Sequence, residues 1–113
     1  VYPELKLDPH VAALGMKFYF GNMFPKAYQQ QVFMAEHGSW NRSKEAGHTG
    51  HRITVARKNS DGKLVYETLI DGWLQKNKAW GRPVDVLELD DGSMLISDDK
   101  AGVIYRLSYQ TSE

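Results

Sequence analysis

Cysteine is absent from the 113 residues of the chain. This absence excludes disulfide bonds, thiolate metal sites and covalent attachment of a c-type haem within this segment. An excess of charge is absent as well, because 14 basic side chains are balanced by 14 acidic ones. A balanced charge gives no electrostatic reason to expect nucleic acid or an anionic membrane as a partner.

Long apolar runs are also lacking. No run approaches the roughly 20 residues that cross a bilayer, so we expect no membrane-spanning segment. Residues 1–6 lack the basic start and apolar core of a signal peptide, and no initiating Met is present. The chain is therefore expected to be a processed or excised piece of a longer protein. No segment shows a 3.6-residue apolar period over the length of a helix, which points to an all-β fold.

Alternating or continuous apolar stretches predict seven strands. The first four are expected over residues 14–20, 31–35, 51–57 and 64–70, and the last three over residues 84–89, 94–96 and 103–109. Residues 59–62 end in Asp-Gly and predict a tight hairpin turn. In the first strand, Leu14, Met16, Phe18 and Phe20 alternate, which predicts a half-buried strand with these side chains on its apolar face.

Four strands followed by three predict two consecutive four-stranded antiparallel blades of a β-propeller, the last blade lacking one strand. We assign residues 1–13 to an irregular lead-in, residues 14–72 to the first blade and residues 73–113 to the second, incomplete blade. A propeller needs at least four blades of about 40–50 residues each. Two readings stay open: a fragment of a longer chain, or several copies that assemble into a ring.

Two of the predicted strands end abruptly in polar side chains. The second strand runs into residues 36–42, and the strand at 94–96 runs into residues 97–100. Polar groups at the end of a buried strand are typical of loops at the rim of a sheet. Second strands of neighbouring blades run in the same direction, so both groups are expected at one rim. The residues expected to meet there are His37, Asn41, Arg42, Arg82 and Lys100.

Several segments resemble, in order, the quinoprotein sugar dehydrogenases of the sorbosone and pyranose dehydrogenase type. The most specific is His37-Gly38-Ser39-Trp40-Asn41-Arg42. The other segments are residues 9–16, 24–25, 81–86, 91–93 and 97–106. The resemblance covers essentially the whole chain and corresponds to the C-terminal part of such proteins.

This resemblance implies a six-bladed propeller that holds pyrroloquinoline quinone (PQQ), with calcium, at the top of its central channel. It implies two-electron oxidation of a sugar or a sugar-derived aldehyde, in the periplasm or outside the cell. The implied partners are that small-molecule substrate and the remaining blades, from the same parent chain or from other copies. By position, His37, Asn41 or Arg42, and Lys100 match family residues that approach the quinone. The family's first blades are missing here, so we expect no activity from this chain alone.

The chemistry of the candidate residues suits a tricarboxylate such as PQQ. The planar guanidinium of Arg matches a carboxylate bidentately, and Lys adds a point charge, which favours Arg42, Arg82 and Lys100 as ligands. Alternatively, these basic side chains are merely solvated. His37 could take a proton from a substrate hydroxyl, because an unperturbed imidazole titrates near neutrality. It could equally contact the cofactor, or hydrogen-bond the backbone at a strand end.

No metal site is predicted from the side chains of this chain. His48 and His51 lie three residues apart, but no third ligand is evident, and extended backbone would point them to opposite faces. We place His48, like Lys63, away from the cofactor. Asp98 or Asp99 is expected to orient Lys100 or to cap a turn. A second class of function stays open, namely a non-catalytic propeller piece that serves binding or scaffolding.

Overall fold

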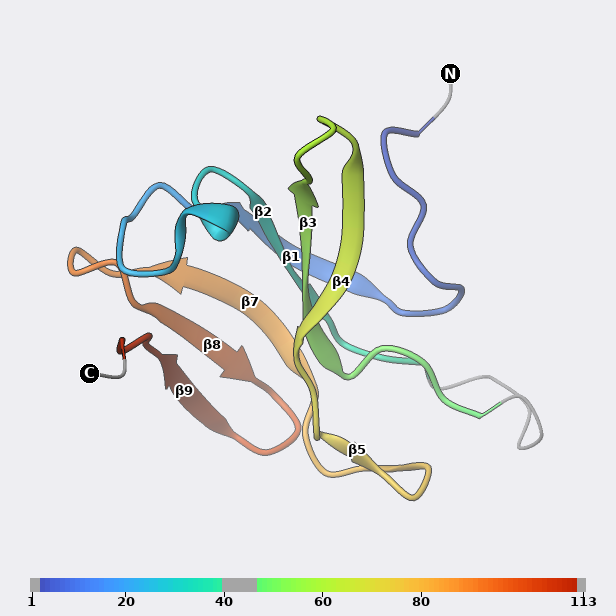
Figure 1. Cartoon of the computed structure of the whole chain (residues 1–113). Coiled ribbons are helices and arrows are strands. Elements are labelled where there is room, and N and C mark those ends of the chain that lie inside the picture. The colour runs from blue at the N-terminus through green and yellow to red at the C-terminus, as the bar shows by residue number, and fades with distance from the viewer. Residues whose placement is uncertain (1–2, 40–46, 112–113) are drawn as a thin grey trace.

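The first sheet contains four antiparallel strands in the order β1-β2-β3-β4 (Figure 1). The computed structural model describes residues 3–39 and 47–111. The strands are β1 (Ala13–Phe18), β2 (Val32–Glu36), β3 (Arg52–Lys58) and β4 (Leu64–Ile70), and a 3-10 turn, η1 (Lys26–Tyr28), precedes β2. The four strands predicted from apolar alternation are confirmed in order and approximate bounds.

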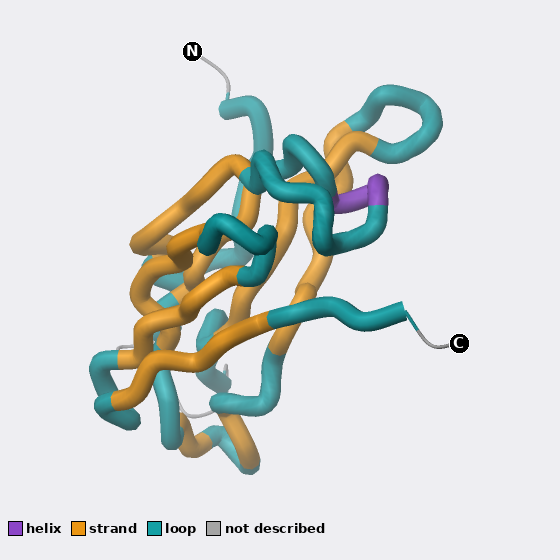
Figure 2. The backbone as a smooth tube through the Cα atoms, turned by 90° about the vertical axis from the view of Figure 1, so that its left-hand side faces the viewer, coloured by secondary structure: helices purple, strands orange, loops and turns teal. Residues whose placement is uncertain are grey.

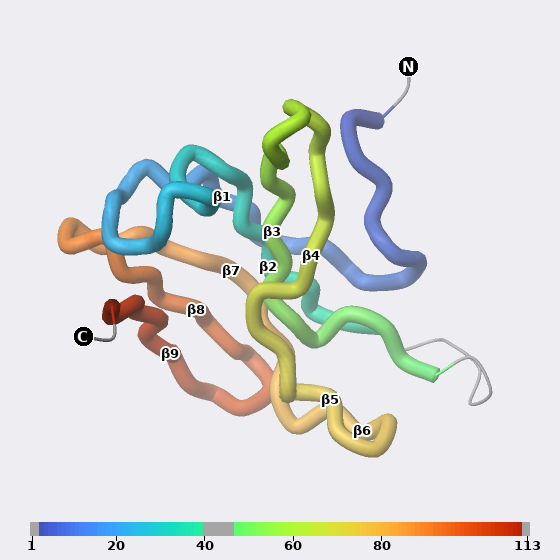
Figure 3. Tube along the Cα trace, in the orientation of Figure 1, coloured from blue at the N-terminus to red at the C-terminus, as the bar shows by residue number. Residues whose placement is uncertain are grey.

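The second sheet contains three antiparallel strands in the order β7-β8-β9. These are β7 (Pro83–Glu88), β8 (Met94–Asp98) and β9 (Val103–Leu107). A short hairpin, β5 (Leu74–Gln75) and β6 (Lys78–Ala79), joins the two sheets, in a segment for which the sequence predicts no strand. Strands of two residues are too short to show an alternating period. The colours of Figure 3 show that the two sheets follow one another along the chain.

The hydrophobic core lies between the sheets, where β1 and β2 contact β7. Its buried members are Tyr19, Phe24, Phe33, Ala35, Ile53, Val55, Trp73, Val86, Met94 and Ile96. The Tyr19 hydroxyl donates to the carbonyl of Gly92 at 2.7 Å and so ties the end of the first strand to the β7–β8 turn. Figure 2 shows that loops connect the strands of both sheets, the helical turn η1 being the exception among the described residues.

The described residues do not bury the apolar face of β1. Leu14, Met16, Phe18 and Phe20 are between 49% and 69% exposed, so the predicted burial of this face is wrong for the described residues. The second sheet instead covers the opposite side of β1. A Cβ atom on Gly15 would lie 2.0 Å from Asp85 Oδ1, so glycine there permits the close approach of β1 and β7.

Candidate functional site

The ends of β2 and β8 meet at one edge of the structure, which we call the rim. His37 follows β2 and Asp99 follows β8, and His37 Nε2 lies 2.8 Å from Asp99 Oδ1. The His37 side chain is 23% exposed and the Asp99 side chain is 63% exposed. His37 and the turn that carries Lys100 therefore lie together, as the direction of the strands predicts. Asn41 and Arg42 lie outside the described residues.

Arg82 ties the entry of β7 to the loop that follows β2. Its Nη1 donates to the Gly38 carbonyl at 3.0 Å, and its Nη2 donates to the Ser39 carbonyl at 3.2 Å. Arg82 thus lies at the rim, as predicted, with part of its guanidinium engaged by the loop. A guanidinium has five N–H donors, and the described residues engage two of those of Arg82.

His48 also contacts this loop, because its Nδ1 lies 3.0 Å from the buried Ser39 hydroxyl. The same hydroxyl accepts the Thr49 N–H at 2.9 Å. His48 therefore contacts the loop that carries His37, while its expected separation from the cofactor stays a prediction. The link is made by side chains across a loop, which strand alternation does not reveal.

Asp98 organises the turn between β8 and β9. Its buried Oδ1 accepts the backbone N–H groups of Arg82, Lys100 and Ala101 at 2.9, 3.0 and 2.8 Å. Its Oδ2 accepts the Tyr105 hydroxyl at 3.1 Å. Burial alone would raise the pKa of Asp98, but these hydrogen bonds outweigh it and hold the pKa below its ordinary value. The predicted capping role falls to Asp98, which also fixes the backbone of Lys100.

The Lys100 side chain is exposed, and its ammonium has no partner among residues 3–39 and 47–111. Its backbone, in contrast, is fixed by Asp98. Within the described residues, the rim therefore presents the available Lys100 cation on an ordered turn, beside a histidine and a partly engaged arginine. Such an arrangement suits a ligand that carries carboxylates.

His51 is a buried residue that the sequence analysis did not assign to the site. It is 1% exposed, and neither ring nitrogen has a hydrogen-bond partner among the residues that the structure describes. Gly38 lies directly against the ring, since a Cβ atom there would be 2.3 Å from His51 Cε1. Burial, and then the charge of Arg82, lower the pKa of His51 from 6.5 to about 4. The ring is therefore neutral near pH 7.

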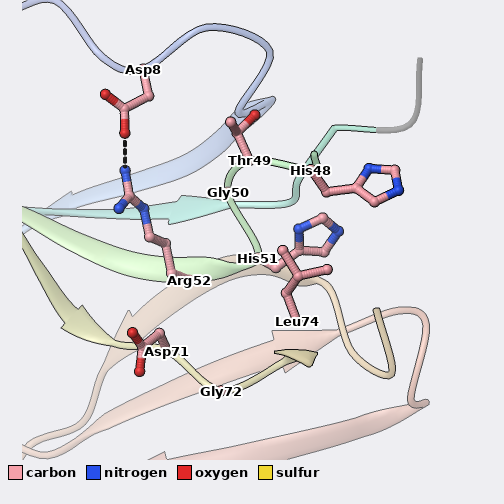
Figure 4. Close-up of a pocket in the computed structure, with 9 residues that line it drawn as sticks. All are labelled: Asp8, His48, Thr49, Gly50, His51, Arg52, Asp71, Gly72 and Leu74. Carbon is pink, nitrogen blue, oxygen red and sulfur yellow. Dashed lines mark hydrogen bonds and ion pairs between the residues drawn. The ribbon is translucent and has the colours of Figure 1, made fainter. Parts of the chain in front are cut away.

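His48 and His51 do not point to opposite faces. Their ring centroids are 6.0 Å apart, with the rings nearly perpendicular at 78° (Figure 4). The extended backbone assumed from the sequence is wrong here, because Gly50 and His51 have φ values of 82° and 59°. Among the described residues, no group of three His, Asp or Glu side chains could hold a metal ion.

A pocket of about 440 Å³ lies beside these histidines (Figure 4). Its lining residues are Asp8, His48, Thr49, Gly50, His51, Arg52, Asp71, Gly72 and Leu74. Arg52 is already paired, with Asp8 at 2.7 Å and with the buried Glu36 at 2.8 Å. Tyr66 also donates to Glu36, and burial followed by this hydrogen bond raises the pKa of Tyr66 to about 12. These interactions hold the wall of the pocket together.

We expect the free energy of unfolding to fall as the pH decreases from 6.5 to 4. Below pH 6.5 the unfolded chain protonates His51, whereas the folded chain resists protonation until about pH 4. The unfolded state therefore binds more protons in this window, which lowers stability by up to about 3 kcal/mol. His51→Asn removes the titration and tolerates positive φ. Urea unfolding at several pH values is expected to show a flatter profile for this variant.

The matched control is His10→Asn. His10 is exposed and has a φ of 61°, close to the 59° of His51. The control is expected to keep the pH dependence of the unmodified chain. An unchanged profile in His51→Asn would contradict the assignment of this pH dependence to the buried ring.

Two solved structures of other proteins are similar in fold to this chain. The structure is similar to the PQQ domain of pyranose dehydrogenase from Coprinopsis cinerea, with a TM-score of 0.68 and 26% identity, over 96% of this chain and 29% of that chain. It is also similar in fold to a Trichoderma reesei structure from carbohydrate-active enzyme family AA12, with a TM-score of 0.64 and 18% identity, over 88% and 25% of the two chains.

The chain belongs to the TrAA12-like family, whose pattern matches residues 1–110. A curated relative from Borreliella burgdorferi, described as an uncharacterized protein, is 43% identical over 106 residues. These residues are 93% of this chain and 28% of the relative, so the chain spans less than a third of that protein. The resemblance to PQQ-dependent sugar dehydrogenases is thereby confirmed at the level of the family. No helix within the described residues has the length and apolar character needed to cross a membrane.

Proposed function

We propose that this chain is the C-terminal part of a quinoprotein oxidoreductase that oxidises a sugar or a sugar-derived aldehyde with PQQ. One observation carries the proposal: His37, Arg82 and Lys100 come from three separate loops and meet at one rim. The direction of the strands brings them together, in a chain of the TrAA12-like family.

The described residues fit part of the cofactor. PQQ carries three carboxylates, and the rim offers the exposed Lys100 ammonium together with the remaining donors of Arg82. We include Asn41 and Arg42 in the proposed site because they follow His37 in the motif that carries the resemblance. Calcium is part of the proposal by resemblance, and its ligands would come from outside the described residues.

Within this site, each residue of the rim has a distinct role. PQQ supplies an ortho-quinone that takes up two electrons from the substrate when bound. His37 accepts a proton from the substrate hydroxyl at a ring nitrogen. Arg82 holds the carbonyls of Gly38 and Ser39 and so keeps the His37 loop in place. Lys100 binds a carboxylate of the cofactor from the ordered β8–β9 turn.

We propose further β-sheet blades as the partners of both outer faces. On one side lie Leu14, Met16, Phe18 and Phe20, with the Phe18 and Phe20 rings stacked at 6.2 Å. On the other side Leu87 and Ile104 are exposed. Apolar faces of this kind are seldom left uncovered. We propose that the assembled protein works in the periplasm or outside the cell, and that this chain is inactive alone.

In isolation, the chain is expected to self-associate through these two faces. Phe20→Lys and Ile104→Lys each place a charge on one face, and each is expected to lower the apparent mass in light scattering. Thr111→Lys adds the same charge at an exposed position beyond β9 and serves as the control. A monodisperse monomer of the unmodified chain would contradict the proposed covering of these faces.

The proposed function is tested by titrating the chain with PQQ in the presence of calcium. We expect a saturable change in the absorption spectrum of the quinone, which Lys100→Ala weakens. The absence of saturable binding would reject the cofactor site. The exposed apolar faces would then favour the alternative function, a non-catalytic propeller piece that acts as a binding or scaffold module.

A further inference from the structure

The contact between His37 and Asp99 determines which ring nitrogen of His37 is basic. An ionised carboxylate only accepts hydrogen bonds, so Nε2, at 2.8 Å from Asp99 Oδ1, must carry a hydrogen. In the neutral ring the lone pair then lies on Nδ1. The sequence does not reveal this pairing, because the two residues are 62 positions apart.

We propose that Asp99 is a positioning residue for His37. It orients the imidazole, keeps the hydrogen on Nε2 and leaves Nδ1 as the nitrogen that receives the proton of a substrate hydroxyl. The inference rests on the proposed function, in which His37 is the base. In the step, the hydroxyl O–H bond breaks and its proton moves to Nδ1. The C–H bond of the same carbon also breaks, its hydrogen leaves with two electrons that bound PQQ would accept, and a carbonyl group forms. The imidazolium that forms is stabilised by the Asp99 carboxylate.

Both sides of the contact are held by ordered backbone. The N–H of His37 donates to the Ala12 carbonyl at 3.0 Å, and the N–H of Gly38 donates to the Val11 carbonyl at 2.9 Å. Asp99 lies between Asp98 and Lys100, in the turn that the Asp98 carboxylate fixes. The β8–β9 turn therefore carries both Asp99, which is the partner of His37, and Lys100.

The competing explanation is an exposed ion pair without functional geometry, since Asp99 is 63% exposed. Exposed pairs of this kind contribute little to stability, so a stability measurement would not separate the two explanations. The rate at which the hydrogen on the imidazole ring exchanges with water does distinguish the two explanations. A ring hydrogen on Nε2 that is held by Asp99 exchanges slowly with water, whereas a ring hydrogen without a fixed acceptor exchanges too fast to be observed.

The test is heteronuclear NMR of the chain with nitrogen-labelled histidine, near neutral pH, with the His37 signals assigned from their loss in His37→Gln. We expect a visible Nε2 hydrogen and an unprotonated Nδ1 in the unmodified chain. Asp99→Ala is expected to abolish the hydrogen signal, and Asp99→Asn to retain part of it because the amide oxygen still accepts. Asp90→Ala removes an exposed aspartate from the β7–β8 turn and is the matched control.

A hydrogen on Nδ1, or an Nε2 hydrogen that survives Asp99→Ala unchanged, would overturn the proposal. Because this readout does not require bound PQQ, its failure is distinct from failure of the proposed function. If the unmodified chain shows the Asp99-dependent hydrogen but no saturable PQQ binding, the cofactor assignment is wrong while the pairing holds. If it binds PQQ but lacks that hydrogen, only the role of Asp99 is wrong.

Discussion

Lys100→Ala is expected to weaken the affinity of the chain for PQQ by about ten- to a hundredfold. The Lys100 ammonium is exposed at the rim, and its backbone is already fixed by the Asp98 carboxylate at 3.0 Å. A hydrogen bond to a charged group contributes roughly 1.5–3 kcal/mol, and about 1.4 kcal/mol corresponds to a tenfold change in affinity. Lys100→Arg keeps the charge and is expected to retain most of the binding.

The matched control for this prediction is Lys63→Ala. Lys63 is exposed beside the β3–β4 turn, at the end of β3 opposite to the end that lies near His51. Absorption titration with PQQ is expected to give the same affinity for Lys63→Ala as for the unmodified chain. Equal losses in both variants would indicate a general effect of charge and would contradict a specific contact by Lys100.

Sequence periodicity predicted the strands but not the face of β1 that this chain buries. Alternation over residues 14–20 shows that one side of the strand is apolar. It cannot show which side faces the second sheet, because that depends on the close approach of Gly15 to Asp85, 70 positions away. The side with Leu14 and Phe18 is apolar but exposed, and the described residues do not include a segment that covers it.

The sequence predicted the part of the candidate site whose position is determined by the direction of the strands. His37 and Lys100 both come just after strands that end at the rim, so local sequence was enough to place them together. The pairing of His37 with Asp99 depends on side-chain contacts between sheets, which local sequence does not encode. His51 was missed for another reason: its positive φ turns the ring away from the position that an extended strand would give it.

Asp98→Ala is expected to lower the free energy of unfolding by at least about 3 kcal/mol. The carboxylate accepts three backbone N–H groups and the Tyr105 hydroxyl, and each hydrogen bond to a charged group contributes roughly 1.5–3 kcal/mol. Contributions of neighbouring bonds are not additive, but truncation leaves several donors without an acceptor in a buried place. Asp98→Asn keeps an acceptor oxygen and is expected to lose less.

Urea unfolding at a fixed chain concentration measures this loss, and Asp90→Ala controls for removal of an exposed aspartate from a turn of the same sheet. The pH dependence gives a second check. Because the pKa of Asp98 is lowered in the folded chain, its contribution is present above the unfolded pKa of about 3.8 and is lost as the pH falls below it. This pH range lies below the range in which His51 affects stability. One series of unfolding measurements at different pH values can therefore distinguish the contributions of Asp98 and His51 to the free energy of unfolding. If Asp98→Ala unfolds at the same urea concentration as Asp90→Ala, the turn that positions Asp99 and Lys100 does not depend on Asp98.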